Sequence, residues 1–148
     1  MKHRILALGM LTALTTSHNA LASEALDIKV YKSPHCGCCG DWVDHLKENG
    51  FEVDVTDSTT MNQVKMDAGL TPQLASCHTA FIGDYVIEGH VPAADIKRLV
   101  EASPDAHGLT VPGMPVGSPG MEMGDRKDHY QVLLFNEAGQ TQVFSEHH

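Results

Sequence analysis

The chain has 148 residues, of which 42% are hydrophobic and 20% are charged, and 19 acidic against 10 basic residues give a net charge of −9. This length accommodates one domain with a hydrophobic core and is too short for two ordinary domains. The acidic balance argues against nucleic-acid binding, because phosphate contacts require clustered Lys and Arg.

The N-terminal residues have the pattern of a secretory signal peptide. Met1-Lys2-His3-Arg4 is basic, an apolar run follows over residues 5–14, and a polar stretch ends in Ala20-Leu21-Ala22. The apolar run is about half of the roughly 20 residues that cross a membrane, which favours cleavage near Ala22 over an uncleaved anchor. We therefore expect an exported, soluble protein with a signal peptide at 1–22 and one mature domain at 23–148.

The first half of the mature chain alternates predicted strands and helices. Alternating apolar and polar residues predict strands, helical spacing of apolar residues predicts helices, and glycines mark where the helices end. The predicted elements are a strand at 26–31, a helix at 38–49 closed by Gly50, a strand at 51–55 and a helix at 58–68.

The next segment predicts a hairpin and a third helix. Strands at 79–82 and 85–88 flank the turn Gly83-Asp84, and Pro92 opens a helix at 93–102. The resulting order is β-α-β-α-β-β-α, with a cysteine pair where the first strand meets the first helix. This combination predicts an α/β protein of thioredoxin-like layout.

The C-terminal part has a different character. Residues 108–124 are rich in Gly and Pro, which we expect to exclude both helix and central strand. Apolar runs at 133–135 and 141–144 predict a terminal hairpin that fixes this methionine-bearing loop at both ends. The last two residues, His147-His148, are expected to be a frayed terminus.

Three of the four cysteines lie in Cys36-Gly37-Cys38-Cys39. Cys36 and Cys39 form a C-x-x-C pair at a predicted helix start, where unpaired backbone N–H groups and the helix dipole favour a thiolate. A thiolate serves equally for redox catalysis and for metal binding, and a purely structural pair is the alternative. Cys38 favours a metal site, because a third thiol would scramble a redox pair, although it could also be a small buried residue.

Cys77 extends this cluster. In thioredoxin-like folds the residue just before the third strand faces the cysteine pair and is usually a cis-proline that blocks metal capture, whereas here Ser76-Cys77-His78 precedes the predicted strand. Four sulfurs would then converge, and soft thiolates select Cu(I) or zinc. The alternative is an unrelated thiol in the core.

Thioether and imidazole groups are further candidate ligands. Met114, Met121 and Met123 occupy the Gly- and Pro-rich loop, where there is little core to fill, and thioethers favour Cu(I) over zinc. These methionines could bind copper or line the path by which it enters, and the alternative is that they only fill space in the packed protein. His78 and His90 are candidate ligands or ligand supports, and His35 could tune the pKa of its neighbour Cys36.

Four motifs, in order, resemble the DUF411 family of bacterial proteins over nearly the whole mature chain. They are the stretch 31–40, Ser76-Cys77-His78-Thr79-Ala80, the stretch 85–92, and Val111-Pro112-Gly113-Met114-Pro115 continuing through Met121. The resemblance implies a periplasmic thioredoxin-like protein of copper resistance. It also implies copper, as Cu(I) or Cu(II), held as a cluster by Cys36, Cys38, Cys39 and Cys77, and other periplasmic copper-handling proteins as partners.

Three hypotheses follow. The first is a copper-binding resistance protein that interconverts Cu(I) and Cu(II). The second is a thiol–disulfide oxidoreductase of the cell envelope with Cys36 and Cys39 as catalytic residues. The third is a structural zinc site, for which a second C-x-x-C pair would be usual.

Overall fold

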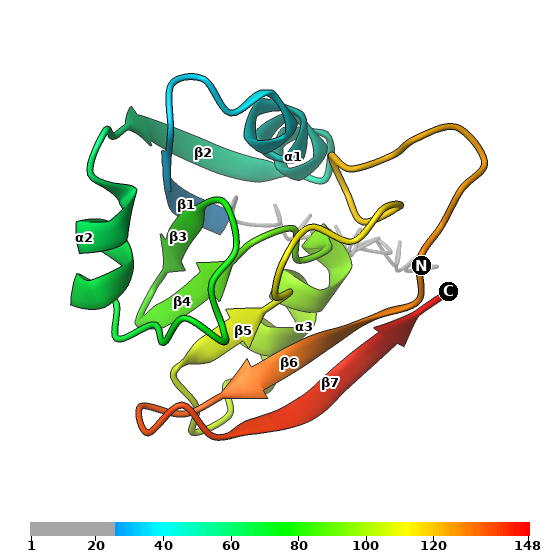
Figure 1. The fold of residues 1–148 in the computed structure, drawn as a ribbon. Helices are drawn as coiled ribbons and strands as arrows, with labels where there is room; N and C mark the ends of the chain where they lie inside the picture. The colour runs from blue at the N-terminus through cyan, green and yellow to red at the C-terminus, as the bar shows by residue number, and fades with distance from the viewer. Residues whose placement is uncertain (1–25) are drawn as a thin grey trace, which may run out of the picture.

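The computed structural model describes residues 26–148, in which three helices flank one seven-stranded sheet (Figure 1). The predicted signal peptide, Met1–Ala22, lies outside the described residues. The strands are β1 (Leu26–Lys32), β2 (Phe51–Asp57), β3 (Thr79–Ile82), β4 (Tyr85–Glu88), β5 (Gly108–Thr110), β6 (Tyr130–Phe135) and β7 (Thr141–His147). The helices are α1 (Gly37–Glu48), α2 (Met61–Asp67) and α3 (Ala93–Ala102).

The strands lie in the order β2-β1-β3-β4-β5-β6-β7 and form a mixed sheet. β1 and β2 are parallel, as are β4 and β5, whereas the other neighbours are antiparallel. The predicted α/β order is confirmed from β1 to α3. None of the helices in residues 26–148 has both the length and the apolar character needed to cross a bilayer.

Each face of the sheet has its own core. On one face, α1 and α3 contribute buried side chains such as Trp42 and Ile96 to a large cluster. On the other face, Leu70 and Leu74, which follow α2, pack with Phe135 in a smaller cluster. Successive residues of β4 point to opposite faces, which divides the strand between the two cores and buries it on both sides.

The expectation that residues 108–124 contain no central strand is wrong for Gly108–Thr110. These residues form β5, which pairs with β4 on one side and with β6 on the other. A Cβ atom at position 108 would overlap the carbonyl oxygen of Val86. Only glycine therefore allows the backbone of β5 to lie this close to β4. The rest of the loop, residues 111–129, runs between β5 and β6, and its two ends are fixed in the sheet as predicted.

Four predicted boundaries also change. β2 continues to Asp57, opposite Lys32 in β1, so α2 begins at Met61 rather than at residue 58. The terminal hairpin is longer than predicted, because β6 begins at Tyr130 and β7 continues to His147. His147 is therefore not frayed: its Nε2 lies 2.8 Å from the Asp95 Oδ2 of α3.

Candidate metal centre

The first group of cysteines is positioned by the junction between β1 and α1. Ser33-Pro34-His35 turns the chain after β1, and Cys36 is the N-cap of α1 in an extended conformation. Cys39 is completely buried, whereas Cys36 and Cys38 are half-buried. The sulfurs therefore lie at the helix end where backbone N–H groups are unpaired and the dipole favours negative charge.

Cys36 and Cys39 form a disulfide, while Cys38 and Cys77 are free thiols. The Cys38 Sγ lies 3.6 Å from the Cys36 Sγ, so Cys38 points toward the other sulfurs rather than away from them. One ligand atom from each of the four cysteines lies within 4.8 Å of the others. The sequence-based expectation that Cys77 approaches the C-x-C-C motif is met in the structure.

Cys77 lies two residues before β3 and is half-buried. The backbone of residues 26–148 contains no cis peptide bond, so the segment before β3 passes the disulfide in an all-trans conformation. Burial, together with the neighbouring Cys38, raises the pKa of the Cys77 thiol to about 11. With the Cys36–Cys39 disulfide formed, the Cys77 thiol is protonated at neutral pH.

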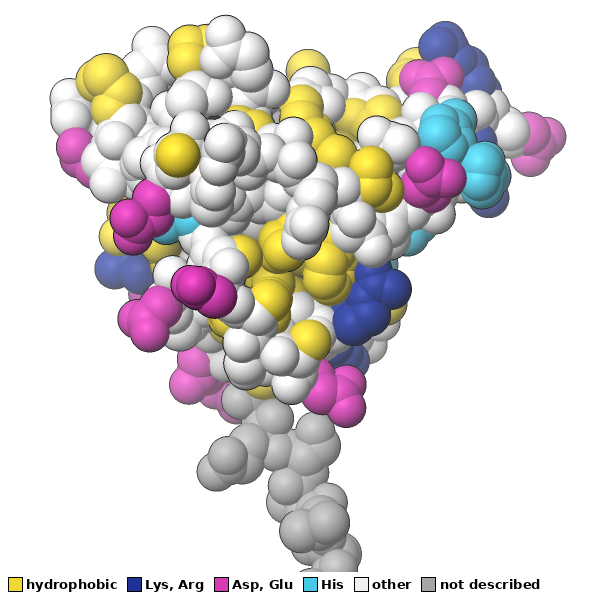
Figure 2. Space-filling model, turned by 90° about the horizontal axis from the view of Figure 1, so that it is seen from below, with side chains coloured by type: hydrophobic (Ala, Val, Ile, Leu, Met, Phe, Trp, Pro, Cys, Tyr) yellow, Lys and Arg dark blue, Asp and Glu magenta, His cyan; other side chains and the backbone are white. Residues whose placement is uncertain are grey.

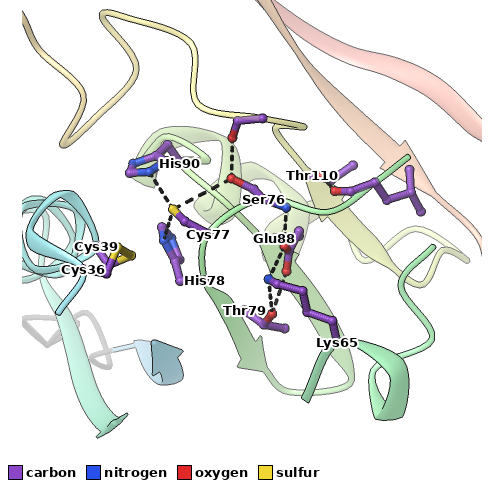
Figure 3. Close-up of polar contacts among 12 residues, drawn as sticks. Cys36, Cys39, Lys65, Ser76, Cys77, His78, Thr79, Glu88, His90 and Thr110 are labelled. Atoms are coloured by element: carbon purple, nitrogen blue, oxygen red, sulfur yellow. Dashed lines mark hydrogen bonds and ion pairs between the residues drawn. A yellow bond between two sulfur atoms is a disulfide. The ribbon is translucent and has the colours of Figure 1, made fainter. Parts of the chain in front are cut away.

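Two buried histidines extend the cysteine cluster (Figure 3). The Cys77 Sγ lies 3.1 Å from His90 Nε2 and 3.3 Å from His78 Nδ1, and these three side chains form a second convergent group of possible metal ligands. Burial lowers the pKa of both imidazoles, in the case of His78 with a further lowering by the neighbouring His90. Both rings are thus neutral, the form that binds metal.

The hydrogen bond made by the Nδ1 atom of His90 determines which tautomer of the ring is present. Nδ1 lies 2.8 Å from the carbonyl oxygen of Pro119, an atom that can only accept, so Nδ1 carries the proton. Nε2 therefore presents a lone pair toward Cys77. A metal-binding imidazole in proteins usually has this arrangement, with the second ring N–H donated to a carbonyl or carboxylate.

His78 is held between aromatic rings. Its ring centroid lies 4.3 Å from that of Trp42 and 4.9 Å from that of His90. Its Nε2 is buried without a hydrogen-bond partner among the described residues. An unpaired polar atom in a buried position is costly, so this ring has bonding capacity that the protein alone does not use.

A buried ion pair supports the segment that carries Cys77. Glu88 of β4 accepts hydrogen bonds from Lys65 Nζ at 2.5 Å, from Thr79 Oγ1 at 2.7 Å and from the backbone N–H of Ser76 at 2.6 Å. Burial raises the pKa of Glu88, and Lys65 opposes this effect. Sequence reasoning missed this network, for which the only signal was a carboxylate in an otherwise apolar strand.

The methionine-bearing loop packs against the start of α1. Gly120 has a φ of 82°, and a Cβ atom there would lie 2.7 Å from the Cys38 carbonyl oxygen and from the Trp42 nitrogen. The neighbouring Pro119 receives the hydrogen bond from His90, and the Gly113 carbonyl accepts one from the Ser76 hydroxyl. The loop thus contacts both the start of α1, which carries Cys38 and Cys39, and the residues around Cys77.

The three loop methionines differ in exposure. Met114 and Met123 are 53% and 62% exposed, whereas Met121 is half-buried. Solvent therefore reaches the side chains of Met114 and Met123, and the roles of all three methionines as ligands stay predictions. His35 is also exposed, beside Cys36.

Comparison with known proteins adds a family and two relatives of known structure. Residues 74–121 match the family described as "Protein of unknown function, DUF411". A structure titled "Copper resistance protein copG- Form 2" is 49% identical with a TM-score of 0.81, and the match covers 84% of this chain and 100% of that one. A second, "Copper resistance protein copG- Form 1", is 50% identical with a TM-score of 0.79, over 84% and 98% of the two chains. No curated protein sequence gives a significant match.

Proposed function

Because the chain belongs to the DUF411 family and is about half identical to copper resistance proteins of known structure, we propose that it is a periplasmic copper-binding protein of copper resistance. It holds Cu(I), as a single ion or as a multi-copper cluster, through cysteine thiolates. Copper is the protein's cargo, and other periplasmic copper-handling proteins are its partners. We also propose that the fold is thioredoxin-like, with the C-x-x-C pair at the junction between β1 and α1.

The convergence of four cysteine sulfurs within 4.8 Å carries this proposal. Thiolates are soft ligands that select Cu(I), zinc or iron–sulfur clusters. Cys38 and Cys77 add two sulfurs to the pair that a redox protein needs, and the imidazole nitrogen of His90 lies beside them. With more sulfurs than one Cu(I) requires, thiolates that bridge two ions are a reasonable arrangement.

Binding through four thiolates requires reduction of the Cys36–Cys39 disulfide. Its reduction takes two electrons, breaks the sulfur–sulfur bond and yields two thiolates. In the reverse direction, the Cys36 and Cys39 thiolates release two electrons as the sulfur–sulfur bond forms, and two Cu(II) ions accept them and become Cu(I), so the disulfide and two copper ions form a balanced couple. This balance supports Cu(I)/Cu(II) interconversion as part of the proposed function.

The roles of the other candidate residues follow from their positions. His90 and His78 are ligands or hold the ligands in place, because both lie within 3.3 Å of the Cys77 sulfur. Exposed thioethers at Met114 and Met123 suit the capture of Cu(I) from solvent or from a partner protein.

The decisive experiment is anaerobic reconstitution of the fully reduced mature protein with Cu(I) in the presence of a chromophoric Cu(I) chelator. We expect one or more copper ions per chain to be retained, and Cys77→Ser to lower the retained number. The matched pair Met114→Leu and Met66→Leu separates the loop thioether from an exposed methionine on α2. Loss of all copper to the chelator, or a preference for zinc in metal competition, would overturn the proposal.

The cellular site is tested separately. Fractionation of the producing cells should recover the protein in the periplasm with an N-terminus near Ser23. Recovery in the cytoplasm with Met1 intact would contradict export.

A second function, thiol–disulfide oxidoreductase, is favoured by one observation: Cys36 and Cys39 form a disulfide at a helix start. In that case Cys36 and Cys39 are the catalytic residues. A disulfide-reduction turnover assay distinguishes the two functions. Activity that is lost in Cys36→Ser but unchanged in Cys77→Ser would favour the oxidoreductase.

A further inference from the structure

A second group of possible metal ligands lies at the far end of the β6–β7 hairpin. One ligand atom from each of His129, Glu146 and His148 lies within 4.8 Å of the others, and all three side chains are exposed. In Figure 2, histidine side chains gather beside an acidic one on the side of the molecule where Figure 1 places the C-terminus. This group shares no residue with the cysteine cluster.

The register of the hairpin explains why these side chains meet. Gln131 lies opposite Glu146 and Tyr130 lies opposite His147 in the antiparallel pair. Because side chains alternate between the two faces of a strand, residues 129, 131, 146 and 148 share one face. The rings of His129 and His148 accordingly lie with their centroids 4.5 Å apart.

Contacts on the opposite face hold the end of the hairpin in place. His147 stacks on Tyr130 with a centroid distance of 4.9 Å, and its Nε2 lies 2.8 Å from the Asp95 carboxylate of α3. On the outward face, Gln131 donates a hydrogen bond of 2.9 Å to Glu146 Oε1. The backbone that carries the three outward side chains is therefore anchored, and one of them is already oriented.

We propose that His129, Glu146 and His148 form a surface site for a divalent transition-metal ion, with Cu(II) as its preferred ion. The two imidazoles are borderline ligands and the carboxylate is a hard one. Sites made of such nitrogen and oxygen atoms bind Cu(II) more tightly than they bind the other divalent first-row metal ions. Metal–ligand bonds of about 2.0 Å place ligand atoms at most about 4 Å apart, so small rotations of these exposed side chains complete the site. Water fills the remaining positions, and binding is reversible.

The two sites differ in chemistry. The cysteine cluster offers soft sulfur ligands that favour Cu(I), whereas the hairpin site offers no sulfur and favours Cu(II). The chain then has a separate place for each oxidation state of copper. The hairpin site stands on its own residues and holds whether or not the cysteine cluster binds Cu(I).

The test uses the mature chain with Cys38→Ser and Cys77→Ser, in which the remaining cysteines are paired as a disulfide and no thiol is left to bind or reduce Cu(II). One equivalent of Cu(II) is added from a glycine complex, and pulsed and continuous-wave EPR count the coordinated imidazoles. We expect two imidazoles. The double variant His129→Ala/His148→Ala should lose this signal and lower the affinity at least about 10-fold, since even outer partners of a metal site are worth 10- to 100-fold.

Matched variants complete the test. Glu146→Gln should weaken Cu(II) binding about 10-fold, whereas Glu137→Gln, which removes an exposed carboxylate in the β6–β7 turn, should leave it unchanged. His35→Ala, which removes another exposed imidazole, should also have no effect. An unchanged two-imidazole signal in His129→Ala/His148→Ala, or its loss in His35→Ala, would overturn the proposal.

Discussion

The Nε2 atom of His90 lies 3.1 Å from the Sγ of Cys77, and the other nitrogen of the same ring is hydrogen-bonded to Pro119. One imidazole therefore connects the thiol before β3 to the loop that carries the methionines. A change at either end of this connection is expected to affect copper binding.

Replacing His90 by Gln should lower the affinity for Cu(I) by about 10- to 100-fold, the usual cost of losing a supporting partner in a metal site. Competition with a chromophoric Cu(I) chelator measures the change. His129→Gln, which removes an exposed imidazole that is not grouped with the cysteines, is the control and should bind Cu(I) as the wild type does. Wild-type affinity in His90→Gln would exclude His90 both as a ligand and as a support for Cys77.

The stability of the metal-free protein should fall as the pH drops below about 6.5. Burial lowers the pKa values of His78 and His90, so both rings stay neutral in the folded state at a pH somewhat below 6.5. In the unfolded chain the same two rings take up protons at their ordinary pKa of 6.5, which favours unfolding as the pH falls. The stabilisation is complete above pH 6.5 and is lost as the pH falls toward the folded-state pKa. Each histidine contributes at most about 1.4 kcal/mol per pH unit.

Urea unfolding between pH 7.5 and 5.5 measures this slope. Glu88, whose pKa is raised by burial, contributes a slope of opposite sign, so the difference between variants is the informative quantity. His90→Gln should reduce the slope relative to the wild type. Equal slopes in the two proteins would contradict the neutral state of His90.

Alkylation of Cys77 should be slow at neutral pH while the Cys36–Cys39 disulfide is intact. Burial raises the pKa of this thiol to about 11. At any pH below that value, the fraction present as reactive thiolate increases about tenfold for each unit by which the pH is raised. Iodoacetamide labelling from pH 7 to 10, followed by peptide mass spectrometry, gives the rate at Cys77 separately from that at Cys38. A rate at Cys77 that levels off below pH 9 would disprove the raised pKa.

Lys65→Met should lower the free energy of unfolding by about 3 kcal/mol, because it leaves the buried Glu88 carboxylate without its counter-charge. Adding Glu88→Gln to this variant should restore part of the loss, since the amide is neutral and still accepts the Ser76 hydrogen bond. Urea unfolding at pH 7 measures both. A loss below about 1 kcal/mol in Lys65→Met would mean that the ion pair does not stabilise this segment.

Gly120→Ala should weaken both the docking of the loop and the retention of copper. The added Cβ would lie 2.7 Å from backbone atoms of α1 at a φ of 82°. Gly113→Ala is the matched control, because its φ is 72° and nothing lies within 4 Å of its Cβ. Both variants incur the conformational cost of about 1 kcal/mol, and only Gly120→Ala should also lose copper. Equal copper retention in the two variants would show that loop docking does not matter for binding.

Local sequence signals predicted most of the fold. Elements such as α1 and the hairpin of β3 and β4 have apolar residues at regular spacing and Gly or Pro at their ends, and these signals act within a few residues. β5 has no such regular spacing, since it consists of three residues, the first of them glycine. It becomes a strand because β4 and β6 pair with it on both sides. That pairing depends on contacts distant in sequence.

The candidate site shows the same division. The C-x-C-C motif and Cys77 could be recognised from residue type and position, and the structure brings their sulfurs together. The Lys65–Glu88 pair could not, because it joins α2 to β4 across 23 positions of the chain. The ligands of the hairpin site were likewise not recognised, since a longer β7 was needed to place Glu146 and His148 beside His129.

The missing side chain of Gly108 has a consequence for the molecule as a whole. β5 joins the four strands that carry the cysteine cluster to the two strands that carry the hairpin site, and this joint depends on contact between the backbones of residue 108 and Val86. With the joint intact, the soft and the borderline ligand sets belong to a single continuous sheet. A larger residue at position 108 would push β5 away from Val86 and weaken the pairing that connects the two groups of ligands.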